Sequence, residues 1–302
     1  MDLTADIPVP AQYRDRRRGL IGFGILEIAL GGLSLLSLAG LFLARVMSFA
    51  VVVYGLGGAA LIWLGIGSIL CRRWARALLL IGSWSWLVGG VIALGFYAGV
   101  IRDLFAAADP AGWLAVGIGA VFFIALPGAL VLFYRSPEVQ ATCEARDPRS
   151  RWTDRCPLPV LACSLWLGLG TCSLLATPGI YRDAVPCFGF FLSGAPAALV
   201  LLIYAAFGFY LAWGTYRLRI SAWWMTLAAF TLFDVSSAVT FLRVDRAELY
   251  RRLGYSKLQI DGLGSVGFFS GAIMAWWIAA IYLLFLIYLT WIRKYFRRAR
   301  LP

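Results

Sequence analysis

The stretch that decides the fold is Ala77–Ile101, ALLLIGSWSWLVGGVIALGFYAGVI, which has no charged side chain in 25 positions. A helix needs about 20 mostly apolar residues to cross a hydrocarbon layer about 30 Å thick. Because lipid offers no partners to unpaired backbone groups, a single run of this kind must be helical. The stretch is therefore predicted to be a transmembrane helix.

Runs of the same character lie on both sides of this stretch. They are uncharged except for one acid each in the first and in the next-to-last, Glu27 and Asp234. They are Gly19–Ala44, Val46–Cys71, Pro110–Tyr134, Cys156–Tyr181, Ala184–Tyr216, Ile220–Leu242 and Gly262–Ile292. A transmembrane barrel would instead show alternating segments of about ten residues. The chain is predicted to be an all-α integral membrane protein with eight transmembrane helices.

The run Ala184–Tyr216 is longer than one span needs. Pro186 and Pro196 lie in its first half, and proline interrupts helices. We therefore expect the helix at Pro196–Tyr216 and an interfacial or re-entrant segment at Cys187–Gly194.

Composition supports this class and excludes much chemistry. Of 302 residues, 62% are hydrophobic and 14% charged, whereas soluble domains average about 45–50% and 25%. The chain has no histidine and no asparagine, which removes imidazole catalysis, histidine metal ligands and N-glycosylation. No G-x-S-x-G motif or acidic cluster is present. We expect no enzymatic activity, no cofactor and no metal site.

The distribution of lysine and arginine predicts the topology. With both termini in the cytoplasm, the inner segments hold 19 of the 27 basic residues, as the positive-inside rule requires. The chain is thus predicted to lie in the cytoplasmic membrane with both termini cytoplasmic. The outer loop 243–261 carries five basic residues, between positions 243 and 257, and goes against this topology, so its true side stays open.

The same charges bear on partners. The bilayer is the expected partner, and the basic segments 14–18 and 293–300 are candidates to attract anionic lipid. The net charge of +12 is explained by topology, so no nucleic-acid partner is expected. A partner that is itself a membrane protein stays an open alternative.

Weak internal similarity indicates a repeat. At an offset of 147 residues, Gly67 and the basic turn after it align with Gly214, and Gly89-Gly90 aligns with Ser236-Ser237. We predict two four-helix halves, 1–135 and 156–302, joined by a charged cytoplasmic linker, 136–155. Because each half has an even number of spans, the halves would be parallel repeats.

Two ionisable residues lie inside predicted spans. Glu27 falls eight residues into the first span and Asp234 fourteen residues into the seventh. Such groups are costly in lipid and mark candidate functional sites. Ser237 and Thr226 share a polar stripe with Asp234. The structural alternative is that these groups join helices by hydrogen bonds.

Two functions follow from these residues. The first is a non-enzymatic multi-pass membrane protein whose biochemical role the sequence does not name, with a structural, assembly or sensory role. The alternative is a secondary transporter or permease-like protein with a site between the two halves near Asp234. Substrate, ligand and oligomeric state are not indicated by the sequence.

The sequence contains two further motifs. A G-x-G-x-x-G pattern at 262–267 lacks the strand that nucleotide binding requires. A short amphipathic helix is predicted at 246–253.

Overall fold

The computed structural model describes residues 14–43, 49–104, 110–181, 185–192, 194–243, 251, 257 and 271–298. The chain divides into two compact units. The first unit is Met1–Ser85 with Leu126–Arg151, and the second is Trp86–Ala125 with Trp152–Pro302. These bounds cut through two helices and differ from the predicted halves 1–135 and 156–302, which stay a prediction.

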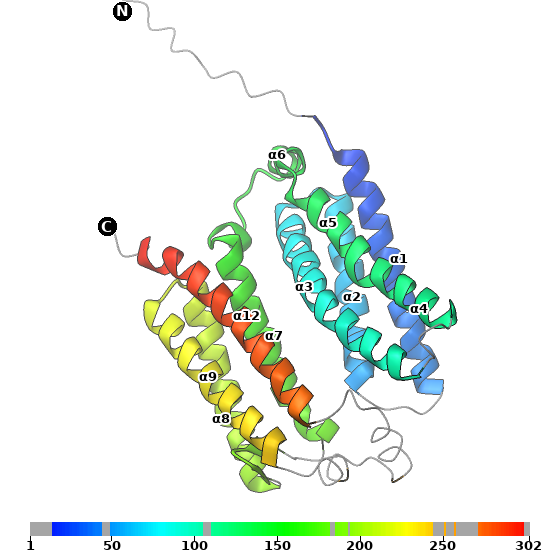
Figure 1. Ribbon diagram of the computed structural model, residues 1–302. Coiled ribbons are helices and arrows are strands. Elements are labelled where there is room, and N and C mark those ends of the chain that lie inside the picture. Colours follow the sequence, from blue (N-terminus) through cyan, green and yellow to red (C-terminus); the bar gives the residue numbers. More distant parts are fainter. Residues whose placement is uncertain are drawn as a thin grey trace, which may run out of the picture. The chain divides into compact units, whose positions relative to one another are not determined.

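The first unit is a helical bundle with a short helix across one end (Figure 1). Its elements are α1 (Arg17–Leu43), α2 (Phe49–Ile69), the beginning of α3 (Arg73–Leu104), α5 (Leu126–Arg135) and α6 (Pro137–Arg146). The helices α1 and α2 pack against each other along their length. The helix α6 follows α5 after one residue, Ser136, because Pro137 forces a new helix start.

The second unit is also a helical bundle. Its elements are the end of α3, α4 (Pro110–Ala120), the π-helical turn η1 (Val121–Ala125), the 3-10 turn η2 (Trp152–Asp154), α7 (Leu158–Tyr181), α8 (Ala195–Tyr216), α9 (Ile220–Arg243) and α12 (Gly271–Arg298). Helix α7 packs on α8, and α9 packs on both α8 and α12. The start of α8 agrees with the helix predicted at Pro196–Tyr216.

A small β-hairpin precedes α8 where the sequence predicted an interfacial or re-entrant segment. Strands β1 (Val185–Cys187) and β2 (Phe190–Leu192) pair antiparallel. Gly189 lies in the turn with φ +98°, a conformation that glycine adopts without strain. The described residues are therefore almost entirely, but not only, helical.

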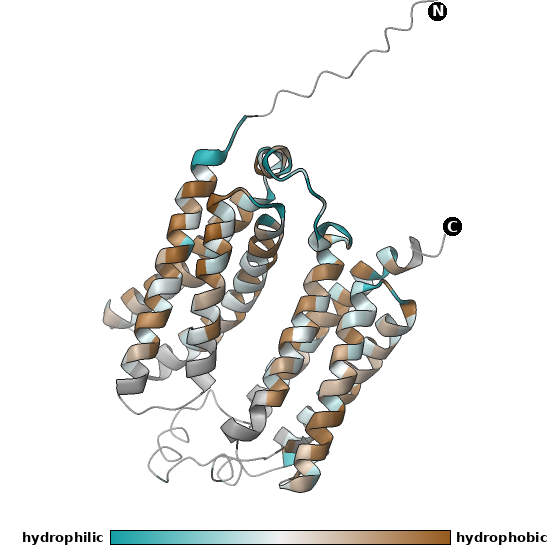
Figure 2. Cartoon of the chain, turned by 180° about the vertical axis from the view of Figure 1, so that it is seen from behind, coloured by the Kyte–Doolittle hydropathy of each residue, from teal (hydrophilic) through white to brown (hydrophobic). Residues whose placement is uncertain are grey.

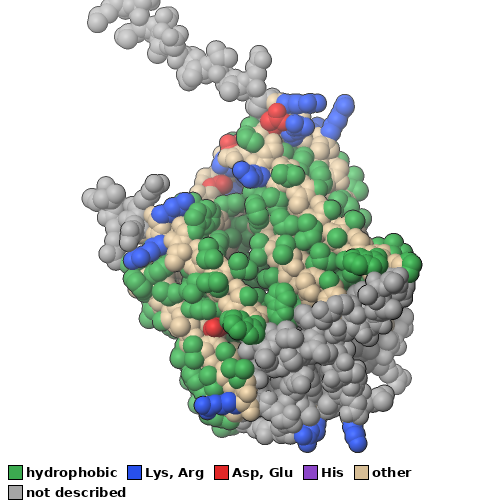
Figure 3. Space-filling model, in the orientation of Figure 1, with side chains coloured by type: hydrophobic (Ala, Val, Ile, Leu, Met, Phe, Trp, Pro, Cys, Tyr) green, Lys and Arg blue, Asp and Glu red, His purple; other side chains and the backbone are tan. Residues whose placement is uncertain are grey.

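The helices have the apolarity of membrane spans. Seven helices of the described residues are long and apolar enough to cross a bilayer, and a shorter apolar stretch, Tyr54–Ile69, lies in α2. Hydrophobic residues run along the helices in Figure 2 and cover much of the face drawn in Figure 3. Leu132 and Trp276 are more than 70% exposed, which suits lipid rather than water. The chain is a multi-pass membrane protein whose helices contact lipid.

The fourth predicted span contains an irregular turn with a local cause. Pro127 has no N–H to bind the carbonyl of Phe123, four residues earlier, and its ring displaces that carbonyl. The helix widens into the π-helical turn η1 at this point. In the second unit the Phe123 carbonyl lies against Gly90 of α3, where an added Cβ would be 2.2 Å from the oxygen. Only a glycine at position 90 allows this contact.

Two helix connections share one geometry. In the first unit Gly67 lies against Ala75, with 2.6 Å between its added Cβ and the Ala75 Cβ; Gly214 and Ala222 repeat this spacing in the second unit. Cys71 and Leu218, each four residues after the glycine, have positive φ values of 53° and 56°. In each turn the backbone N–H of the following residue, Arg72 or Arg219, donates to the glycine carbonyl at 2.9 Å. All three correspondences keep the offset of 147 residues.

Two predicted features fall largely outside the described residues. The amphipathic helix at 246–253 is described only at Arg251, and the glycine pattern at 262–267 is not described. The side of the loop 243–261 accordingly stays a prediction.

Candidate functional site

Glu27 is a fully buried carboxyl of the first unit, with 1% of its surface exposed. The Tyr134 hydroxyl of α5 lies 2.9 Å from Glu27 Oε1 and 2.9 Å from the Ser68 hydroxyl of α2. Ser68 donates to the Leu20 carbonyl of α1 at 3.0 Å. Glu27 Oε2 is buried and has no hydrogen-bond partner among the described residues. Three helices thus meet at one carboxyl.

Glycines explain why this carboxyl is enclosed. Gly24 and Gly31 lie on the same face of α1 as Glu27, one turn on either side of it. An added Cβ at Gly24 would be 2.8 Å from the Gly65 carbonyl, and one at Gly31 would be 2.6 Å from the Gly58 carbonyl. The backbones of α1 and α2 therefore approach too closely for larger side chains, as small residues permit in membranes.

Arg76 of α3 also holds Tyr134 in place. The tyrosine is fully buried, and Arg76 donates from Nε to its backbone carbonyl at 3.2 Å. Arg76 also donates to the Gln140 side chain of α6 at 3.1 Å. The tyrosine that contacts Glu27 is thereby fixed to both α3 and α6.

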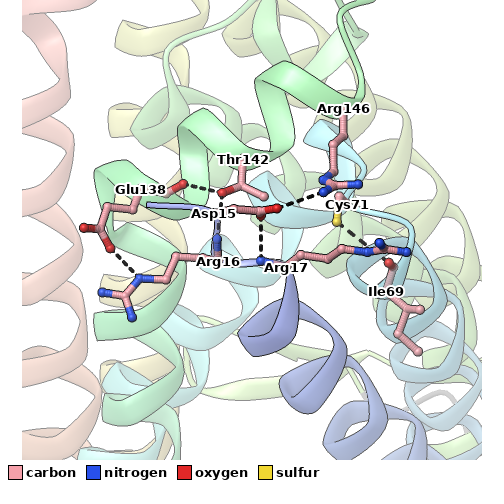
Figure 4. Close-up of polar contacts among 8 residues, drawn as sticks. All are labelled: Asp15, Arg16, Arg17, Ile69, Cys71, Glu138, Thr142 and Arg146. Atoms are coloured by element: carbon pink, nitrogen blue, oxygen red, sulfur yellow. Dashed lines mark hydrogen bonds and ion pairs between the residues drawn. The ribbon is translucent and has the colours of Figure 1, made fainter. Parts of the chain in front are cut away.

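Ion pairs tie α6 to the residues just before α1 (Figure 4). Arg146 donates to Asp15 at 2.8 Å, and Arg16 pairs with Glu138. The Arg16 backbone N–H donates to the Thr142 hydroxyl at 3.1 Å. The hydrogen bond from Arg146 holds the pKa of Asp15 below its usual value. These contacts hold α6 against the N-terminal end of α1, which is the end of that helix nearer to Glu27.

A second carboxylate, Asp147, anchors the end of α6. It is 2% exposed and accepts hydrogen bonds from Arg151 at 3.0 and 3.3 Å. Burial alone would raise its pKa. The hydrogen bond and charge of Arg151, the N–H of Arg73 and the charge of Arg72 outweigh burial, and the pKa is lowered. Asp147 is therefore a stable anion.

The other predicted site residues lie on α9 in the second unit. Thr226 is 1% exposed and its hydroxyl has no partner among the described residues, while Ser237 is buried. Asp234 is half-buried, between the exposed Phe233 and Val235. Within the described part of the chain, Asp234 makes no hydrogen bond or ion pair through its side chain.

An open apolar groove runs along the same helix. The groove is lined by Trp224, Leu227, Ala228, Thr231, Leu232 and Val235, and Asp234 is not among these residues. Within the described residues, no group of three or more His, Cys, Asp or Glu side chains could hold a metal ion. The groove can therefore contact apolar chains, but its lining residues include no acidic side chain.

Buried hydroxyls on α9 have a structural partner that the sequence did not indicate. Ser236 Oγ accepts from the Phe188 N–H at 3.1 Å, and Thr240 Oγ1 accepts from the Gly189 N–H at 3.0 Å. The tip of the hairpin is thus docked on α9. This contact satisfies two backbone groups that a tight turn leaves free.

Sequence reasoning found Glu27 but missed its partners. Tyr134 and Ser68 stand near the ends of apolar runs, where a polar side chain is a weak signal. Tyr134 contacts Ser68, 66 positions away, and Glu27, 107 positions away, and periodicity within one helix carries no information on such pairing.

Comparison with known proteins finds no match among protein families, curated proteins or solved structures. The site is accordingly interpreted from its own geometry.

Proposed function

We propose that this chain is a non-enzymatic membrane protein of eight spans, with both termini in the cytoplasm and a role in assembly or sensing. The observation that carries the proposal is the use of polar side chains between helices. Ser34 donates to the Tyr54 carbonyl at 2.9 Å, and Ser164 donates to the Ala212 carbonyl at 2.8 Å. Such bonds join helices in lipid.

The eight-span count and the repeat belong to this proposal. The stretch Tyr54–Ile69 of α2 supports an eighth span beside the seven longer ones. The matched turns at Cys71 and Leu218 support two related four-helix halves. In the parallel arrangement that we propose, both basic turns face the cytoplasm, where positive charge is retained. The charged linker 136–155 would lie on the same side.

The alternative function is a secondary transporter with a site near Asp234, between the two halves. A single observation favours it. Asp234 lies within a span, and the hydrogen bonds and ion pairs of the described residues leave it out. An intramembrane carboxylate in that situation is typical of an ion or proton pathway. The same half-burial between two exposed apolar neighbours equally suits a position at the lipid surface.

Chemical labelling separates the two functions. In a variant whose native cysteines are replaced, Asp234→Cys and Val235→Cys would be treated with a water-soluble, membrane-impermeant thiol reagent from either side. A transporter requires aqueous access to position 234 and not to its lipid-facing neighbour. The assembly role predicts that both cysteines react equally slowly. Fast labelling at position 234 alone would contradict the assembly or sensing role and support the transporter.

A further inference from the structure

The hydroxyl contacts around Glu27 contain a proton-counting constraint. Three oxygen pairs lie within hydrogen-bond distance: Glu27 with Tyr134 at 2.9 Å, Tyr134 with Ser68 at 2.9 Å, and Ser68 with the Leu20 carbonyl at 3.0 Å. Each contact needs one proton. The two hydroxyls carry one proton each, and a carbonyl carries none. An ionised Glu27 therefore leaves one pair of oxygens facing each other without a proton.

A proton on Glu27 resolves the count. Glu27 then donates to Tyr134, Tyr134 donates to Ser68, and Ser68 donates to the Leu20 carbonyl. Every contact has its proton and all bonds run in one direction. No other protonation of these four groups satisfies all three contacts, because the Leu20 carbonyl can only accept.

The second carboxyl oxygen supports the same conclusion. Glu27 Oε2 is buried without a partner among the described residues. An unpaired anionic oxygen in such a place costs far more than an unpaired carbonyl. The ion pairs of the described residues do not include Glu27 either. Among the described residues, Tyr134 is the titratable group that faces Glu27, while Arg76 and Cys143 of α6 lie near Tyr134.

We propose that Glu27 is a proton-binding site that joins α1, α2 and α5 through Tyr134 and Ser68. The ligand is the proton itself. When the carboxyl loses its proton, Tyr134 must turn its O–H toward the new carboxylate and can no longer donate to Ser68. Ser68 has one proton, so it can then donate either to Tyr134 or to the Leu20 carbonyl, and one of these two contacts is lost. The hydrogen bonds that tie α2 to α1 and α5 thus depend on the protonation of a group in α1. This proposal does not depend on whether the chain has a role in assembly, sensing or transport.

Infrared spectroscopy of the purified full-length protein in lipid nanodiscs tests the site. A protonated carboxyl has a C=O stretching band separate from the bands of carboxylates and amides. At neutral pH, where an exposed glutamate is ionised, we expect such a band in the wild-type protein. Glu27→Gln removes it, and the control Glu138→Gln, outside the spans, leaves it unchanged. A wild-type spectrum identical to that of Glu27→Gln in this region would overturn the proposal.

A second variant keeps the test decisive if Glu27→Gln does not fold. Tyr134→Phe preserves the ring and the carboxyl but removes the acceptor of the proposed Glu27 hydrogen bond. The carboxyl band should remain and shift to higher frequency, because its hydrogen bond is lost. A merely structural, ionised Glu27 gives no carboxyl band in either protein. A band that does not move in Tyr134→Phe also contradicts the proposed direction of the chain.

Discussion

Gly89 and Gly90 are neighbours in α3 with different surroundings. An added Cβ at Gly90 would lie 2.2 Å from the Phe123 carbonyl oxygen, whereas one at Gly89 meets nothing within 4 Å. We predict that Gly90→Ala destabilises the protein by about 1–3 kcal/mol, since backbone must move. Gly89→Ala, the matched control, should be neutral or slightly stabilising. Thermal unfolding of both variants in the same detergent gives the comparison, and equal midpoints would contradict it.

The ion pairs of Asp147 make stability depend on acid. Its folded pKa is lowered, while an unfolded aspartate has a pKa of about 3.9. Its contribution is therefore fully present above about pH 4 and is lost as the pH falls through the lowered folded value. We expect Asp147→Asn to cost about 1–3 kcal/mol at neutral pH and progressively less in strong acid.

Unfolding free energies of wild type and Asp147→Asn, measured from neutral pH downward, test this expectation. The two curves should converge below pH 4. Arg151→Gln serves as the matched partner variant, because it removes the donor of both side-chain hydrogen bonds to Asp147. Curves that stay parallel over the whole range would show that Asp147 is not the group responsible.

Among the elements, the hairpin β1–β2 owes its position to two hydroxyls of α9. Ser236→Ala removes the acceptor of the Phe188 N–H, and Thr240→Val removes that of the Gly189 N–H. An unpaired buried donor costs about 1–3 kcal/mol. We predict that hydrogen exchange of residues 188–189 accelerates about tenfold or more in each variant. Thr231→Val, on the same helix but without a contact to the hairpin, is the control, and equal exchange in all three variants would refute the docking.

The elements also show what a sequence of this kind can predict. Long uncharged runs predicted where the membrane-spanning helices lie, and Pro196 correctly marked the start of α8. The hairpin was not predicted, because Cys187–Gly194 is as apolar as its surroundings and its docking depends on Ser236 and Thr240, about 50 residues away. The π-helical turn was not predicted either, although its local cause, Pro127, stands in the sequence.

The candidate site was predictable only in part. A lone acid in an apolar run is conspicuous, so Glu27 and Asp234 both stood out. Their environments differ for reasons that the sequence does not carry. Close glycine contacts enclose Glu27 beside two hydroxyls, whereas exposed apolar neighbours flank Asp234.

At the scale of the whole molecule, the number of spans has a simple consequence. Among the residues that the structure describes, seven helices are long and apolar enough to cross a membrane, and α2 contains a shorter apolar stretch. If α2 also crosses, the spans number eight and both termini lie on one side. If it does not, the termini lie on opposite sides. The parity of the spans therefore decides the proposed architecture of two four-helix halves.

Protease accessibility of the two termini in sealed vesicles measures this parity directly. Epitope tags would be placed before Met1 and after Pro302 of the full-length protein. The proposed architecture predicts that both tags are protected in right-side-out vesicles and that both are cleaved in inverted vesicles. Cleavage of one tag with protection of the other, in either preparation, would contradict eight spans and the parallel repeat with it.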